Sequence, residues 1–157
     1  MTDAELIEKL KADLGDKVAE IANPAGRRLF LKVAPADLVA VTTRLRDAYG
    51  LVFLSTISGV DQGETFEIIY HFSTPETDFN LRTEIPKAAP HVDSITPVIP
   101  GAVLYERELQ DMYGMIIDGL PDPRPLLLPD GWPAGDHPLL KDWKHARPEE
   151  IIPGGKS

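Results

Sequence analysis

The sequence predicts an α+β domain, in which helices pack on an antiparallel or mixed sheet, followed by an extended proline-rich C-terminal arm. Two observations predict this architecture. Before about residue 118, some segments carry apolar residues at helical spacing and others carry them at every second position. Ten of the 15 prolines then lie in residues 97–157. We therefore divide the chain into a compact unit, residues 1–118, and an arm, residues 119–157, that is not an independent domain.

The first helix is predicted from Thr2 to Gly15. Thr2 and Glu5 have the spacing of a capping box, and Gly15 can end the helix. Its apolar residues at helical spacing are Leu6, Ile7, Leu10 and Leu14. A β-hairpin should follow, with strands at residues 17–22 and 27–33 joined by a turn at the sequence Asn-Pro-Ala-Gly, residues 23–26.

A second helix is predicted from Pro35, which suits a first helical turn, to Gly50. Three strands then follow at residues 51–60, 65–73 and 78–85, and the alternation in residues 65–73 is the clearest strand pattern in the chain. Because short turns join these strands, we expect an antiparallel meander with helices on one face. Residues 92–96 should form a short extended piece, and residues 101–113 a third helix that Gly114 ends.

The arm has a backbone chemistry of its own. Residues 121–138 contain six prolines, so this stretch can form neither a helix nor a central strand. It is nevertheless rich in large apolar residues, which disordered segments usually lack: Leu126, Leu127, Leu128, Trp132, Leu139, Leu140 and Trp143. We therefore expect an arm that is ordered by lying on a surface, either that of its own domain or that of another chain.

Composition excludes several classes of function. The 157 residues include no cysteine, which rules out disulfides, thiolate zinc sites, iron–sulfur ligation and a cysteine nucleophile. The net charge of −9 argues against nucleic-acid binding, and no apolar run is long enough to span a bilayer. The acidic N-terminus does not resemble a signal peptide, so we expect a soluble, intracellular protein.

The densest polar cluster lies on the third predicted helix and comprises Glu106, Arg107, Glu108 and Asp111. Arg107 and Asp111 are four residues apart, so a helical ion pair is available. Glu108 and Asp111 share a face and could perform acid–base chemistry or hold a metal. We favour a solvated or interface face, with the acids on the polar side, because no catalytic or metal-binding motif accompanies them. No catalytic, cofactor-binding or metal-binding residue is predicted in this chain.

Residues 106–114, with the sequence ERELQDMYG, resemble the signature of the 30 kDa subunit of respiratory complex I, also called the C subunit of NADH-quinone oxidoreductase. Residues 121–124, 126–130 and 138–142 resemble the segments that follow in that family, in the same order and spacing. The front half matches the family only in its order of helices and strands.

Three departures from the family pattern are informative. Leu120 replaces a histidine, Leu140 replaces an arginine, and Gln110 stands where tryptophan is frequent. Leu140 and the sequence PRPLLLP of residues 123–129 look closer to the corresponding subunit of membrane-bound, energy-converting nickel–iron ([NiFe]) hydrogenases. The equivalent subunit of an NADH-quinone oxidoreductase, or of a related coenzyme- or ferredoxin-linked complex, is the alternative.

The resemblance implies a subunit of an oxidoreductase complex that is not itself catalytic and scaffolds the electron-transfer module. It implies no cofactor in this chain and hetero-oligomeric partners, namely a hydrogenase-type large subunit and iron–sulfur subunits, which would carry the [NiFe] and iron–sulfur centres. It places the subunit peripherally, on the cytoplasmic side of the cell membrane. The residues expected to contact partners are Glu106, Arg107, Glu108, Asp111, Arg124, Trp132, Lys141, Asp142 and Trp143. A remote alternative is a stand-alone hydrolase that uses Glu108, Asp111 and a histidine.

Overall fold

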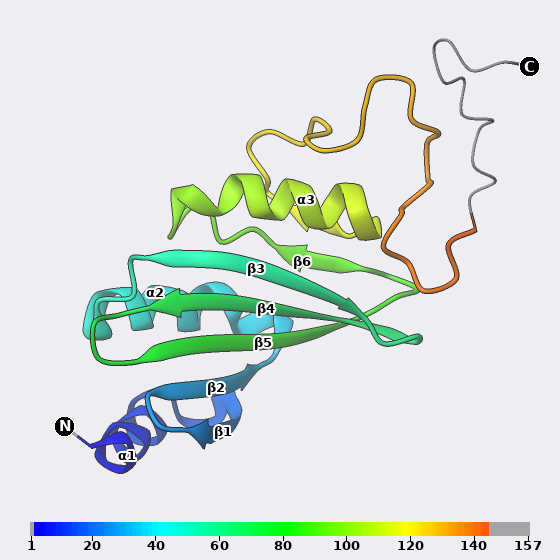
Figure 1. The fold of residues 1–157 in the computed structure, drawn as a ribbon. Helices are drawn as coiled ribbons and strands as arrows, with labels where there is room; N and C mark the ends of the chain where they lie inside the picture. The colour runs from blue at the N-terminus through cyan, green and yellow to red at the C-terminus, as the bar shows by residue number, and fades with distance from the viewer. Residues whose placement is uncertain (1, 145–157) are drawn as a thin grey trace, which may run out of the picture.

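A computed structural model describes residues 2–144, so the end of the predicted arm, residues 145–157, lies outside the described part. Five strands form one mixed sheet in the order β1-β2-β5-β4-β3, and a second sheet has two strands, β6 and β7 (Figure 1). The strands are β1 (Val18–Ala25), β2 (Arg28–Val33), β3 (Leu54–Asp61), β4 (Thr65–Ser73), β5 (Asp78–Pro86), β6 (His91–Asp93) and β7 (Ile116–Asp118). The helices are α1 (Asp3–Leu14), α2 (Leu38–Tyr49) and α3 (Val103–Tyr113).

One face of the large sheet forms the core. Leu31, Leu81 and Tyr70 lie beside one another across β2, β5 and β4, and all three are buried. Because alternate residues of a strand share a face, the predicted stripe of β4 points the same way. The buried leucines of α1 and α2 belong to the same cluster. The α+β fold with helices on a mixed sheet is therefore confirmed.

The sequence pattern did not predict that β2 and β5 pair in parallel. Helix α2 carries the chain from β2 to β3 at the far edge of the sheet, and β4 and β5 then fill the space between them. The three strands β3, β4 and β5 form the expected antiparallel meander. The mixed character arises where this meander meets the first hairpin.

The turn of the first hairpin lies further along the chain than predicted. Strand β1 continues through Ala25, and the turn residues are Gly26 and Arg27, with Arg27 at a φ of 63°. Its backbone amide donates to the Asp3 carboxylate at 2.9 Å, and its guanidinium donates to the Pro75 and Glu76 carbonyls. These long-range bonds offset the cost of a left-handed backbone at a residue with a side chain.

The second sheet was not predicted as a sheet. Strand β6 overlaps the expected extended piece, residues 92–96, only at Val92 and Asp93, and β7, which pairs with it in parallel, follows α3. Each strand has only three residues, which is too short for a period of two to stand out in the sequence. Residues 119–144, the described part of the predicted arm, contain no helix or strand.

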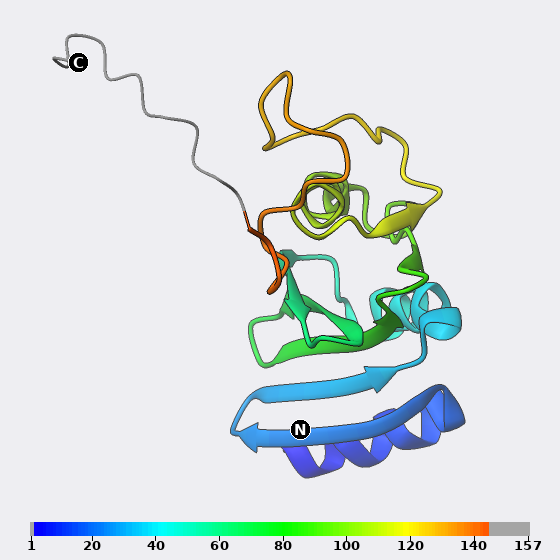
Figure 2. The same ribbon diagram turned by 90° about the vertical axis from the view of Figure 1, so that its right-hand side faces the viewer.

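Helix α3 covers the outer edge of the large sheet, beside β3 (Figures 1 and 2). The hydroxyl of Tyr105 donates to the Ser55 carbonyl at 3.0 Å, and that of Tyr113 donates to the Gly59 carbonyl at 2.6 Å. Eight helical residues rise about 12 Å, and four strand residues span about 13 Å, so the two spacings match. The tyrosines thus satisfy carbonyls that an edge strand would otherwise expose.

Candidate functional site on helix α3

Helix α3 starts after a short turn at Pro100–Ala102 and ends at Gly114, whose φ of 73° suits glycine. The buried Leu109 and the two tyrosines face the sheet. The charged residues of the sequence ERELQD therefore project at different angles around the helix. They do not form one polar face.

Glu106 points inward and is fully buried. Its carboxylate accepts hydrogen bonds from the Ser94 hydroxyl at 2.6 Å and from the Ile95 amide at 2.8 Å. Burial raises the pKa of this carboxyl, although both hydrogen bonds favour the charged form. The expectation that all acids mark the polar side of α3 was therefore wrong for Glu106, because the preceding loop supplies polar partners inside the core.

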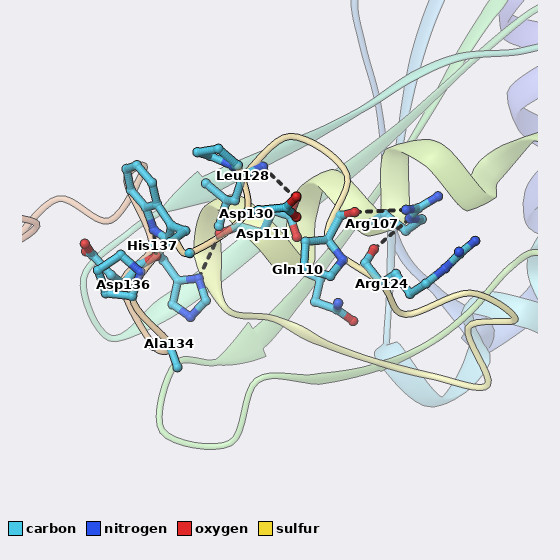
Figure 3. Close-up of a pocket in the computed structure, with 15 residues that line it drawn as sticks. Arg107, Gln110, Asp111, Arg124, Leu128, Asp130, Ala134, Asp136 and His137 are labelled. Atoms are coloured by element: carbon cyan, nitrogen blue, oxygen red, sulfur yellow. Dashed lines mark hydrogen bonds between the residues drawn. The ribbon is translucent and has the colours of Figure 1, made fainter.

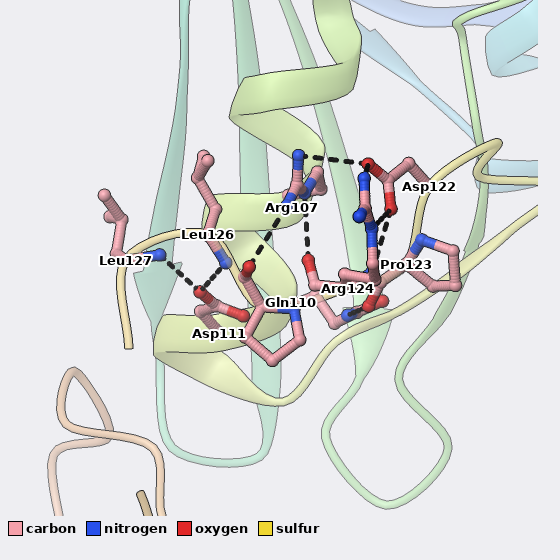
Figure 4. A network of polar contacts seen from close by, with 9 residues as sticks. Arg107, Gln110, Asp111, Asp122, Pro123, Arg124, Leu126 and Leu127 are labelled. Carbon is pink, nitrogen blue, oxygen red and sulfur yellow. Dashed lines mark hydrogen bonds and ion pairs between the residues drawn. The ribbon is translucent and has the colours of Figure 1, made fainter. Parts of the chain in front are cut away.

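Arg107 binds the segment that returns over α3 (Figure 4). Its guanidinium donates to the carbonyls of Arg124 at 2.9 Å and Pro125 at 3.1 Å, and it forms an ion pair with Asp122 at 3.3 Å. The available Arg107–Asp111 helical pair is not used. The Arg124 guanidinium, followed by that of Arg107, lowers the pKa of Asp122 strongly.

Asp111 binds the next three residues of the same segment. One of its carboxylate oxygens accepts from the amides of Leu126 and Leu127, both at 2.8 Å, and of Leu128 at 3.3 Å (Figure 4). Successive amides that converge on an anion resemble the backbone concavities that bind free anions. Here the anion is the protein's own buried side chain. Helix α3 therefore binds backbone groups of this segment through Arg107 and Asp111.

An open pocket of about 750 Å³ is lined by residues of α3 and by residues between 124 and 137 (Figure 3). His137 closes one end, where its Nδ1 donates to the Asp111 carbonyl at 2.8 Å and its ring lies against Gly114. The indole Nε1 of Trp132 donates to the Asp136 carbonyl at 2.7 Å, and Trp143 donates to the carboxylate of the same residue. These bonds give the proline-rich segment a defined path.

Near its described end, the arm contacts Asp61, the last residue of β3. The Asp61 carboxylate accepts from the Lys141 amide at 3.0 Å and the Lys87 ammonium at 2.8 Å, and Lys87 also lies 3.5 Å from Asp142. Burial alone would raise the pKa of Asp61, but Lys87 and the amides of Lys141 and Gly63 outweigh it and lower the pKa to about 2. No sequence pattern singled out Asp61, which directly follows the strand predicted at residues 51–60.

Glu108 differs from the other charged residues of α3. It is half-buried, and it makes no hydrogen bond or ion pair with any residue between 2 and 144. The side chain of Arg124 is 80% exposed and pairs only with Asp122 among described residues.

The arrangement does not suit the hydrolase alternative. Asp111 is occupied by backbone amides, and His137 faces the carbonyl of Asp111 instead of its carboxylate. Within residues 2–144, no three histidine, aspartate or glutamate side chains converge as a metal site would need. In the same residues, no helix is both long enough and apolar enough to cross a membrane.

Comparison with known proteins identifies relatives. Residues 31–149 match a family described as "Respiratory-chain NADH dehydrogenase, 30 Kd subunit". The C subunit of NADH-quinone oxidoreductase from Mesorhizobium japonicum is 34% identical over 149 residues, which cover 89% of this chain and 73% of the relative. The same subunit from Brucella abortus is 38% identical over 145 residues, which cover 88% and 70%.

Two solved structures share the fold. A trypsin-resistant fragment of Nqo5, residues 1–134, has a TM-score of 0.64 at 21% identity, and the match covers 78% of this chain and 99% of the fragment. A chain of the membrane-bound sulfane sulfur reductase, an archaeal respiratory membrane complex, has a TM-score of 0.69 at 18% identity, covering 91% and 86%. At these identities, the likeness concerns the fold alone.

Proposed function

Because this chain belongs to the 30 kDa subunit family of the respiratory-chain NADH dehydrogenase, we propose that it is a structural subunit of the peripheral, electron-transferring arm of an NADH-quinone oxidoreductase-type complex. The observation that carries this proposal is that charged side chains of the family signature bind other parts of this same chain. Glu106, Arg107 and Asp111 are engaged in holding the chain's own backbone. Side chains used in this way build a surface and are not free to act on a substrate.

The surface in question is the proline-rich segment laid over α3. Proline reduces the conformational entropy that is lost when an extended segment is ordered, which favours docking. The segment exposes large apolar side chains, among them Leu127 at 51% and Leu139 at 50%. We place partner contacts along it at Arg124, Trp132, Lys141, Asp142 and Trp143, with residues 1–118 as the compact unit and residues 119–157 as the arm.

In this proposal, the redox centres reside in the partner subunits, and this chain supplies none of them. It would sit peripherally on the cytoplasmic side of the membrane, attached through the subunits it contacts. The curated relatives, named as subunits of NADH-quinone oxidoreductase, support the quinone-reducing type of complex.

The membrane-bound [NiFe] hydrogenase type is the second candidate. It is supported by Leu120, Leu140 and the sequence of residues 123–129, and by the fold shared with a chain of the sulfane sulfur reductase. In that case, the main partner would be a hydrogenase-type large subunit with a [NiFe] centre, alongside iron–sulfur subunits.

Purification of the tagged full chain from its native host in mild detergent tests the proposal. We expect co-purification of iron–sulfur subunits and of membrane subunits, identified by mass spectrometry. NADH-dependent quinone reduction by the purified complex would support the first candidate, and hydrogen evolution with a reduced ferredoxin would support the second. A monodisperse monomer that never captures an oxidoreductase subunit would contradict both.

A further inference from the structure

One strip of α3 is only partly covered by the rest of the described chain. Leu104 and Glu108 lie one turn apart on it, and the Leu104 side chain is 52% exposed. Asp111, three residues after Glu108, binds the backbone amides of Leu126 and Leu127, and both leucines are exposed (Figure 4). The strip therefore combines apolar side chains with a single carboxylate.

We propose that this strip, Leu104, Glu108, Leu126 and Leu127, is the surface that receives a partner subunit, and that Glu108 accepts an arginine or lysine of that partner. The inference rests on the proposed function and specifies its contact. The other three charged signature residues are satisfied within the chain, and Glu108 has no counterpart among the described residues. A half-buried carboxylate one helical turn from an exposed leucine is costly to cover further unless a cation pairs with it.

The chemistry of the strip favours a partner surface that carries a basic side chain. A purely apolar partner would bury the carboxylate without compensation, and an acidic one would be repelled by a chain of net charge −9. Arginine suits the site best, because its guanidinium can bind a carboxylate with two hydrogen bonds while its methylene stem covers neighbouring apolar side chains. Lysine would satisfy the charge with less directional contact.

The test compares Glu108→Gln and Glu108→Lys with Glu76→Gln, which changes an exposed glutamate in the β4–β5 turn. Each tagged full chain replaces the native one in its host, and retention of partner subunits is measured after a salt wash. We expect at least about tenfold lower retention for Glu108→Gln, since loss of one charged partner at a covered interface has effects of this size or larger. Glu108→Lys should abolish retention, and Glu76→Gln should leave it unchanged.

Two further measurements separate the explanations. The thermal unfolding temperature of the purified Glu108→Gln chain should equal that of the wild type, because no described internal contact is lost. A photoreactive amino acid at position 104 should cross-link to a basic peptide of another subunit. Cross-linking to residues 145–157 of the same chain, a lowered unfolding temperature, or full retention of the Glu108 variants would overturn the inference. If the wild-type chain captures no partner, the proposed function itself fails.

Discussion

Replacing Asp111 by asparagine should loosen residues 126–128 from α3 without changing the shape of the side chain. The carboxylate accepts two short backbone hydrogen bonds at 2.8 Å and one longer bond at 3.3 Å. A hydrogen bond to a charged group contributes about 1.5–3 kcal/mol, and one between neutral groups about 0.5–1.5 kcal/mol. Losing the charge should therefore cost about 1 kcal/mol for each short bond, or about 2 kcal/mol in total.

Amide hydrogen exchange measures this cost locally. About 2 kcal/mol corresponds to a roughly 30-fold larger opening equilibrium, so the amides of Leu126 and Leu127 should exchange about 30-fold faster in Asp111→Asn. The midpoint of urea unfolding should fall less, since the segment can detach while the sheet stays folded. Glu108→Gln is the matched control, because it removes a carboxylate from the same helix without removing a hydrogen bond to a described residue.

Exchange rates for Leu126 and Leu127 that stay within twofold of wild type in Asp111→Asn would refute the idea that the carboxylate holds the segment. Equal acceleration in Glu108→Gln would refute it as well, because the effect would then follow from the charge of the helix and not from these hydrogen bonds.

Three other outcomes follow from the same structure. Gly59→Ala should lower the free energy of unfolding by about 1–3 kcal/mol in urea titrations, because the added Cβ would lie 2.6 Å from a tyrosine ring of α3; Gly101→Ala, where nothing lies within 4 Å, should be nearly neutral. Asp61 should stabilise the fold above its unfolded pKa near 3.8, and this contribution should disappear as pH falls toward 2; Asp61→Asn should flatten that part of the stability curve, and an unchanged curve would contradict the Lys87 ion pair. The pH dependence expected for Glu106 is the reverse, because folding raises its pKa. Its contribution to stability should be largest in acid and decline as pH rises through the folded pKa. Glu106→Gln should remove this decline in urea titrations, and a decline that persists in the variant would contradict the role of Glu106.

Local patterns were sufficient to predict most of the fold. The capping box at Thr2 and Glu5 forms as expected, and the alternation in residues 65–73 corresponds to β4 with the same bounds. These features depend on contacts within a few residues, or on which face of a strand is apolar. The turn at Arg27 was misplaced because its conformation depends on Asp3 and on the β4–β5 turn, which are distant in sequence.

The candidate site was predicted only as a set of residues. Spacing identified the charged residues of α3 as a cluster. It could not show which of their side chains would be buried, because the carboxylates are chemically alike and a helix presents side chains in all directions. Asp61 carried no distinguishing signal, since an acid in a tight turn is common. Its role depends on Lys87 and on the amide of Lys141, 80 residues further along the chain.

The sequence by itself determined the α+β class, the order of the first helices and strands and the family resemblance, because all of these follow from short-range periodicity and motif spacing. Only the tertiary structure decided that Glu106 turns into the core while Glu108 stays at the surface. The same holds for the parallel pairing of β2 with β5 and for the path of the arm over α3. The physical reason is that a buried carboxylate or an ordered proline-rich backbone needs hydrogen-bond partners, and here folding brings those partners from other parts of the chain.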